Sequence, residues 1–87
     1  MKLNFYSDPG HGWLKVPHAL VNDLGIANKI TRYSYMDAYS AYLEEDCDLS
    51  LFMKKAEETG LKIEFVDHYT NNDSPIRKLS RYFTIGE

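Results

Sequence analysis

The sequence predicts one small α+β domain, with a mostly antiparallel sheet of about five strands, two helices in the order ββα-ββα-β, and a C-terminal tail. Its 87 residues are enough for one domain and too few for two. Short segments in which apolar and polar residues alternate indicate strands, and two segments with apolar residues at helical spacing indicate helices. We assign residues 1–70 to the domain and residues 71–87 to a tail that either extends freely or packs on it.

The N-terminal segment predicts a β-hairpin. Leu3 and Phe5 alternate with polar neighbours, as in a strand with one buried face. In the turn that follows, Pro9 fixes φ at the second position and Gly10 permits the positive φ of a type II turn at the third. Gly12–Val16 then forms the return strand.

A short helix and two further strands come next. Pro17 is placed to open a helix over residues 17–24, because proline is favoured in the first helical turn. Gly25 is placed to end that helix in the left-handed conformation. The β-branched and aromatic content of Ile30–Met36 and Tyr39–Glu45 predicts two strands joined by a tight turn.

The second helix has the clearest periodicity in the chain. Its apolar residues fall at positions i, i+3, i+4 and i+7, namely Leu49, Phe52, Met53 and Ala56. Asp46 or Asp48 can cap its N-terminus, where a carboxylate meets free N–H groups and the positive end of the dipole. Gly60 is expected to end it.

The rest of the chain predicts one more strand and a mixed tail. Alternation over residues 61–65 indicates the fifth strand. Residues 71–73 form a loop, and Ser74 followed by Pro75 is a helix-start signal. Tyr82–Ile85 is more typical of a strand, which can pair with an edge of the sheet.

Composition excludes several classes of protein. Cys47 is the only cysteine, so no intramolecular disulfide forms and a secreted disulfide scaffold is excluded. No apolar stretch approaches the ~20 residues that a membrane span needs. The segment after Met1 lacks the pattern of a signal peptide, so we expect a cytoplasmic protein and no membrane partner. The net charge of −3 makes nucleic acid the less favoured partner.

The loop between the first two strands is the first feature that the predicted core does not explain. It contains Asp8, His11 and Trp13, and loops on rigid scaffolds often carry functional residues. The spacing of Asp8 and His11 matches no metal or triad signature, and no close Cys/His pair suggests structural zinc. We therefore predict no catalytic, cofactor-binding or metal residues, and interpret the loop as either a turn or a binding surface.

Two charged segments are the other unexplained features. Glu44 and Glu45 begin an acidic run that either ends a strand and caps a helix or contacts a basic partner. Arg77 and the cations after it form a basic end that is either solvated or contacts phosphate or an acidic protein. The seven tyrosines suit strands and contact surfaces alike. The candidate partner-binding residues are Asp8, His11, Trp13, Tyr42, Glu44, Glu45, Arg77, Lys78, Arg81 and Tyr82.

Cys47 lies between Asp46 and Asp48 at the predicted helix start. The helix end would lower the pKa of the thiol and the neighbouring acids would raise it, so these effects oppose each other. We interpret Cys47 as a small structural thiol.

Several strings of residues together resemble a group of short uncharacterised proteins encoded by bacteriophages, plasmids and their hosts. These strings are Ser7–Pro17, Tyr33–Tyr35 and Ala41–Asp48, with Phe52 after them. The resemblance implies a mobile-element accessory protein and transfers no activity and no site residue. It implies further that the chain binds and blocks a protein of a bacterial host, as small phage proteins often do to defence complexes.

We therefore expect a small non-enzymatic binding protein that modulates a bacterial host protein and works in the host cytoplasm. The alternative is a nucleic-acid-associated regulator that uses the basic C-terminal segment together with Lys29. An enzyme would need a pocket that joins His11 with Asp8, or Cys47 with a histidine. An unpaired sheet edge would also support a homodimer.

Overall fold

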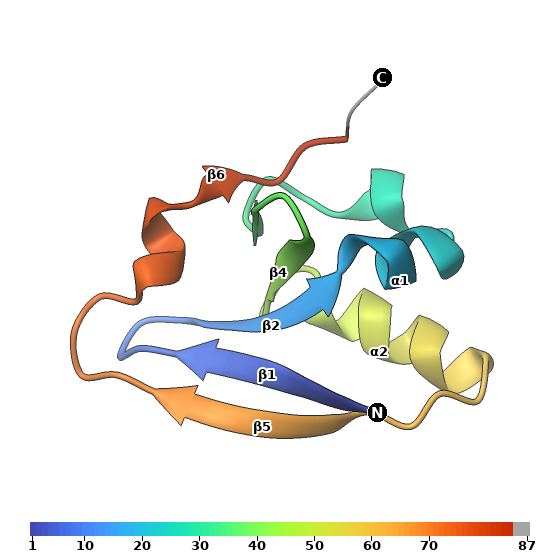
Figure 1. The fold of residues 1–87 in the computed structure, drawn as a ribbon, viewed down its shortest axis with the longest axis horizontal. Helices are drawn as coiled ribbons and strands as arrows, with labels where there is room; N and C mark the ends of the chain where they lie inside the picture. The colour runs from blue at the N-terminus through green and yellow to red at the C-terminus, as the bar shows by residue number, and fades with distance from the viewer. Residues whose placement is uncertain (85–87) are drawn as a thin grey trace.

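A six-stranded mixed sheet forms the centre of the computed structural model, which describes residues 1–84 (Figure 1). The strands are β1 (Lys2–Ser7), β2 (Gly12–Pro17), β3 (Tyr35–Met36), β4 (Ser40–Glu44), β5 (Glu64–Tyr69) and β6 (Ser80–Arg81), in the spatial order β5-β1-β2-β4-β3-β6. The helices are α1 (His18–Asp23) and α2 (Leu49–Glu58), with single-turn helices η1 (Ala27–Lys29) and η2 (Pro75–Lys78). The predicted α+β class and its two helices are confirmed. The sheet has six strands where about five were predicted, and it contains one parallel pair.

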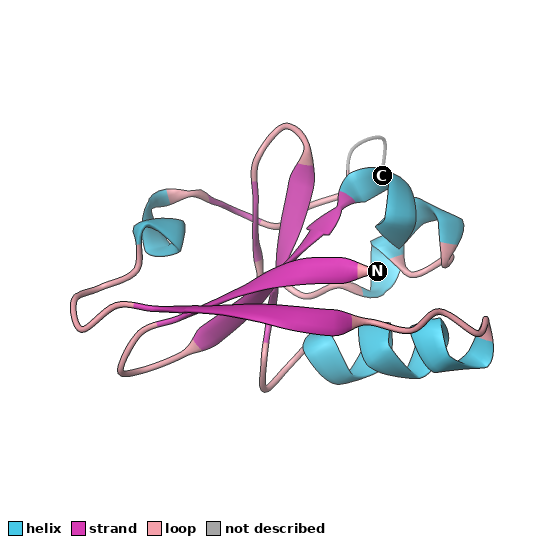
Figure 2. Ribbon diagram, turned by 60° about the horizontal axis from the view of Figure 1, so that its bottom comes forward, coloured by secondary structure: helices cyan, strands magenta, loops and turns pink. Residues whose placement is uncertain are grey.

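The two faces of the sheet are covered by different parts of the chain. Because side chains alternate along a strand, Leu14 and Leu43 point to one face, where they join the core that contains Phe52 of α2. Trp13 and Tyr42 point to the other face, where they pack with Ile76 of η2. Figures 1 and 2 show α1 and α2 together at one end of the sheet and η2 at the other. Ile76 of η2 and the neighbouring Leu79 thus cover the second face.

The N-terminal hairpin forms as predicted, but its turn is of a different kind. Strands β1 and β2 pair antiparallel. Gly10 does not have the positive φ of the predicted type II turn, so that detail is wrong. The Asp8 carboxylate instead accepts hydrogen bonds from the N–H groups of Gly10 and His11, at 2.9 and 3.0 Å. This side-chain contact closes the turn without a left-handed residue.

The predicted strand over Ile30–Met36 is wrong for most of its length. Only Tyr35 and Met36 pair with β4. The residues before them bind the buried carboxylate of Asp48 instead, which accepts from both the N–H and the hydroxyl of Thr31. Side-chain acceptors of this kind compete with the hydrogen bonds of a sheet. For the same reason the Asp48 side chain does not cap α2, although the residue stands at its N-cap position.

Both helices end at the predicted glycines. Gly25 and Gly60 have φ of +73° and +81°, the left-handed conformation that glycine adopts without a steric cost. After Gly60, the N–H of Leu61 donates to the carbonyl of Ala56 at 2.8 Å, which satisfies one of the free carbonyls of α2.

The fifth strand begins later than predicted and runs parallel to β1. The prediction placed it over residues 61–65, and the structure places β5 at Glu64–Tyr69. Leu3 lies opposite Phe65, whose ring stacks on Phe5 at a centroid distance of 5.5 Å. Most of β5 is exposed, so its sequence lacks the alternation that a half-buried strand shows. Strands β5 and β6 are the two edges of the described sheet.

Residues 74–84 pack on the rest of the chain. The hydroxyl of Ser74 accepts from the N–H of Ile76 and caps η2, as its position before Pro75 predicts. The strand β6 lies just before the predicted one, and Ile85 is outside the described residues. Tyr82 is buried, and its hydroxyl donates to the carbonyl of Ala27 at 2.7 Å. None of the helices in residues 1–84 is long and apolar enough to cross a membrane.

This packing predicts that substitution of Tyr82 lowers the free energy of unfolding much more than substitution of Phe83 does. Tyr82→Ala is expected to lower the free energy of unfolding by about 3 kcal/mol, since it leaves a cavity in the core and removes a buried hydrogen bond. Phe83 is half exposed, so Phe83→Ala is expected to change the free energy of unfolding by about 0.5 kcal/mol or less. Urea unfolding followed by circular dichroism measures both. Equal effects of the two substitutions would show that this segment does not pack as described.

Candidate functional site

Side chains from distant parts of the sequence line one cleft of about 230 Å³. They come from β2 and the turn before it, from β3 and the residues before it, from β4, and from the C-terminal segment. The lining residues are His11, Trp13, Tyr33, Tyr35, Glu44, Arg77 and Arg81. The loop, the acidic run and the basic end, which the predicted core left unexplained, therefore meet at one place.

Strand pairing brings these residues together. In the register of β2 and β4, Trp13 lies opposite Glu44. In the register of β3 and β6, Tyr35 lies opposite Arg81. Residues that lie opposite each other in paired strands point to the same face of the sheet. All four residues therefore lie on the face that η2 partly covers. The cleft thus opens on the side of the sheet away from α1 and α2.

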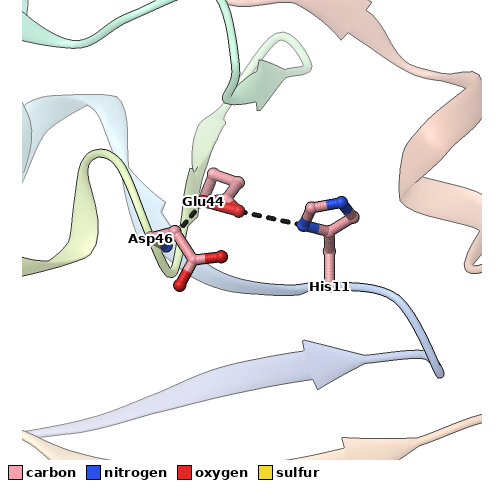
Figure 3. A group of neighbouring side chains, drawn as sticks. All are labelled: His11, Glu44 and Asp46. Atoms are coloured by element: carbon pink, nitrogen blue, oxygen red, sulfur yellow. Dashed lines mark hydrogen bonds and ion pairs between the residues drawn. The ribbon is translucent and has the colours of Figure 1, made fainter.

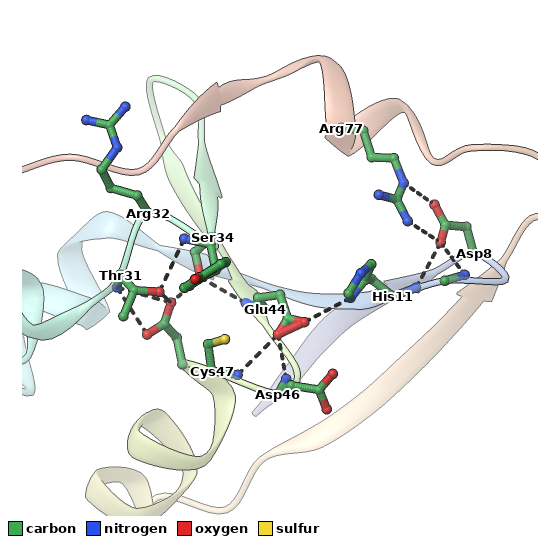
Figure 4. A network of polar contacts seen from close by, with 12 residues as sticks. Asp8, His11, Thr31, Arg32, Ser34, Glu44, Asp46, Cys47 and Arg77 are labelled. Carbon is green, nitrogen blue, oxygen red and sulfur yellow. Dashed lines mark hydrogen bonds and ion pairs between the residues drawn. The ribbon is translucent and has the colours of Figure 1, made fainter.

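The Asp8–Arg77 pair fixes one wall of the cleft (Figure 4). Arg77 donates from Nε and Nη2 to the two carboxylate oxygens of Asp8, at 2.7 and 2.9 Å. Asp8 also accepts from the backbone N–H of Ser74 at 2.9 Å. The Arg77 guanidinium holds the pKa of the Asp8 carboxyl well below its usual range, and Asp8 raises the pKa of Arg77. Both groups therefore remain charged, and they tie the hairpin turn to the C-terminal segment.

Two guanidinium groups lie over aromatic rings in this cleft. Arg77 lies over Trp13 with a distance of 5.1 Å to the ring centroid, and Arg81 lies over Tyr35 at 4.6 Å. The rings of Trp13 and Tyr35 contact each other edge to face at 6.0 Å. The indole N–H of Trp13 is buried and has no hydrogen-bond partner among the described residues. A buried donor without an acceptor is costly, so this N–H reduces what the packing of Trp13 contributes to stability.

An imidazole and a carboxylate that line the cleft, those of His11 and Glu44, lie close to a second carboxylate, that of Asp46 (Figure 3). Nδ1 of His11 lies 3.1 Å from Oε1 of Glu44. The other oxygen of Glu44 accepts from the N–H groups of Asp46 and Cys47, at 2.6 and 3.1 Å. One ligand atom each of His11, Glu44 and Asp46 lies within 4.8 Å of the others. Glu44 is buried, whereas His11 and Asp46 are exposed, so solvent reaches the group from one side.

A second network of hydrogen bonds, centred on the buried carboxylate of Asp48, holds Glu44 in place. The hydroxyl of Ser34 donates to Asp48 at 2.5 Å and accepts from the N–H of Glu44 at 2.9 Å. Thr31 donates to the same Asp48 carboxylate from its N–H and its hydroxyl. The position of Glu44 is therefore held by β4 pairing and by a buried chain of hydrogen bonds (Figure 4).

The opposing effects at Cys47 are decided in favour of a raised pKa. Desolvation comes first among the causes, followed by the negative charges of Glu44 and Asp48. The side chain is a neutral thiol at pH 7, because its ordinary pKa is already above that value. This state disfavours Cys47 as a nucleophile.

The structure separates the predicted contact residues into two sets. Asp8, Trp13, Tyr42, Glu44 and Tyr82 are buried, so none of these side chains forms an exposed surface. They shape the cleft or the core instead: the Tyr42 hydroxyl, for instance, donates to Asp37 at 2.7 Å. His11, Glu45, Lys78 and Arg81 are exposed and Arg77 is partly so, and they remain candidates for contact.

Sequence reasoning missed three residues of this region as site residues. Tyr33 and Tyr35 line the cleft, and Asp46 completes the group around His11. In the sequence, Tyr33 and Tyr35 belong to a predicted strand and to one of the strings that carry the resemblance. Asp46 is a candidate helix cap within an acidic run. No local spacing separates them from residues of the same kind elsewhere, because the cleft is made by pairing between strands.

A larger hollow of about 630 Å³ lies along α2 and the residues that follow it. It is lined by residues such as Met53, Lys54 and Lys62 and contains no buried polar side chain. We therefore place the candidate site in the smaller cleft, where charged groups are held in fixed positions.

No protein-family model, curated protein or solved structure matches this chain.

Proposed function

We propose that this protein is a small binding protein that takes an acidic segment of a partner protein into the cleft between His11 and Arg81. The observation that carries the proposal is the pair of guanidinium groups lying over Trp13 and Tyr35. Arginine and large aromatic residues dominate the energetics of protein–protein interfaces when they are held rigidly in this way.

The groups in this wall favour a partner that accepts hydrogen bonds. Arg77 uses Nε and Nη2 on Asp8, and its Nη1 has no partner among residues 1–84. Arg81 is exposed, and within residues 1–84 it donates only to the carbonyl of Arg32, at 3.3 Å. A carboxylate side chain would satisfy such donors, and a cleft of about 230 Å³ suits one inserted side chain.

The resemblance to proteins of bacteriophages and plasmids supports a partner from a bacterial host, such as a component of a defence complex. The proposal includes that the chain acts by occupying this partner, without a chemical step of its own. The raised pKa of Cys47 fits a non-enzymatic role, because it keeps the single thiol of the chain protonated.

Reversing the charge of Arg81 is expected to abolish capture of the partner. Arg81→Glu replaces the exposed cation of the cleft with an anion that repels an acidic segment, so a bound host protein should fall at least about tenfold in affinity purification. Lys54→Glu is the matched control, since Lys54 is exposed on α2 and lines only the larger hollow. Quantitative mass spectrometry of material purified from bacterial lysates measures both.

Three results would contradict the proposal. Equal recovery with wild type and Arg81→Glu would show that the cleft is not the contact. Loss with Lys54→Glu alone would place the contact on the larger hollow along α2. Recovery of no stoichiometric partner from several hosts would contradict a host-binding role. Circular dichroism of each variant verifies that it is folded.

A second candidate function is supported by a hollow of about 380 Å³ next to the cleft. It is lined by Arg32, Tyr33 and Arg81, and the Tyr33 side chain is 65% exposed. Single-stranded nucleic acids stack on exposed aromatic rings in positively charged grooves, and here such a ring shares a hollow with two arginines. The net charge of −3 acts against such binding. Steeply salt-dependent binding of a labelled single-stranded oligonucleotide, lost in Tyr33→Ala, would favour this function over protein binding.

A further inference from the structure

We propose that His11, Glu44 and Asp46 form a binding site for a first-row divalent cation, with Zn²⁺ as the best-matched ion. This inference does not depend on the proposed partner, because it concerns the isolated chain. It departs from the prediction that the chain has no metal residues, which rested on the absence of a sequence signature. The three residues come from the hairpin turn, from β4 and from the segment after β4, so no motif in the sequence connects them.

The distances fit an ion shared by three ligands. Nδ1 of His11 and Oε1 of Glu44 are 3.1 Å apart. Two donors that bind one tetrahedral zinc at about 2.0–2.2 Å lie about 3.4 Å from each other, so a small displacement admits the ion. The Asp46 oxygen lies within 4.8 Å of both, and its exposed side chain is free to rotate toward them (Figure 3).

Hydrogen bonds from the backbone orient Glu44 as they orient carboxylates that bind metals. Oε2 of Glu44 is held by the N–H groups of Asp46 and Cys47, which leaves Oε1 directed at His11. In metal sites, groups that hydrogen-bond to the metal-binding side chains fix the orientation of those side chains. Glu44 is buried, while His11 and Asp46 are exposed, so an ion can enter from solvent. Water would complete the coordination on that side.

Local charge also favours a cation. Two carboxylates of the group lie together, and Glu45 and Asp48 add two more in the same segment. The Arg77 guanidinium, which lines the same cleft, is already paired with Asp8. On binding, the Nδ1 lone pair of neutral His11 coordinates the ion and the ring proton resides on Nε2, so the Nδ1–Glu44 hydrogen bond is replaced by two metal–ligand bonds.

The donor set selects the class of ion. An imidazole with two carboxylates suits zinc and its first-row neighbours better than calcium, which prefers six to eight oxygen ligands. The Cys47 thiol is not a member of the group, so the site lacks the soft ligand that would favour copper(I).

Isothermal titration of the purified chain with Zn²⁺ tests the site, with Co²⁺ absorption as a second readout of the coordination geometry. We expect one ion per chain, and we expect His11→Ala and Asp46→Asn each to weaken binding about tenfold or more, because each removes a ligand. His68→Ala is the matched control: it also removes an exposed imidazole, but His68 lies on β5 against Tyr6 and Asn4. The control should bind as the wild type does.

Both substitutions are at exposed positions, so the variants are expected to fold, and circular dichroism verifies it. Absence of stoichiometric Zn²⁺ binding by the wild type would overturn the site. Wild-type affinity in either His11→Ala or Asp46→Asn would overturn the three-ligand assignment. Loss of binding in His68→Ala would place the ion on β5 instead. None of these results bears on partner capture by Arg81, so the two proposals fail separately.

Discussion

Replacing Asp8 with asparagine is expected to lower the free energy of unfolding by about 3 kcal/mol. The side chain is buried and accepts from Arg77 twice and from three backbone N–H groups, so an amide would place a donor against a donor. Breaking a buried charged pair also leaves the remaining charge without compensation. Urea unfolding at pH 7 measures the effect, and Asp67→Asn on the exposed strand β5 is the control.

The same substitution is expected to remove part of the acid sensitivity of the fold. The pKa of Asp8 is lowered in the folded chain, chiefly by Arg77, from about 3.9 in the unfolded chain. A lowered pKa means that the unfolded chain binds the proton more tightly. The stabilisation from Asp8 is therefore complete above about pH 4–5 and is lost as the pH falls below that value. If wild type and Asp8→Asn lost stability in parallel between pH 5 and pH 2, the pair with Arg77 would not be the cause.

Asp48→Asn is expected to have an effect of similar size, about 3 kcal/mol, from a different cause. The Asp48 carboxylate is buried and accepts from two hydroxyls and one N–H, on Thr31 and Ser34. An amide keeps the shape and loses acceptors, so buried donors would be left without partners. Ser34 also positions Glu44, so the substitution should displace the wall of the cleft.

Asp46→Asn is the control for Asp48, because it changes the same chemical group two residues away at an exposed position. It is expected to change the free energy of unfolding by about 0.5 kcal/mol or less. Thermal or urea unfolding of the two variants side by side gives the comparison. Similar values for both would show that Asp48 is not the buried centre of this network.

Local signals in the sequence were sufficient for the elements that depend on local physics. The N-terminal hairpin, α2 and its glycine end follow from alternation, helical spacing and the left-handed preference of glycine. The strand predicted over Ile30–Met36 failed because a carboxylate 17 residues away binds Thr31. The predicted position of the fifth strand was wrong because exposed edge residues such as Asp67 and His68 do not alternate in polarity.

The candidate site was predictable in its parts and not in its assembly. The loop with His11, the acidic run and the basic end were each recognised as unexplained by the core. Their meeting in one cleft depends on which strands are neighbours, such as β3 with both β4 and β6, and periodicity carries no information on strand order. The same limitation concealed the contact of His11 with Glu44, which are 33 positions apart.

The parallel pairing of β1 with β5 has a consequence for the way the chain folds. β1 lies at the start of the chain and its partner is complete only at Tyr69, so these contacts have a very large sequence separation. On the ribosome, the outer edge of the hairpin remains without a partner on the order of seconds, until β5 has been synthesised. Proteins dominated by such distant contacts fold slowly. The hairpin and α2 are therefore expected to form first, and the closing of the sheet by β5 is expected to limit the folding rate.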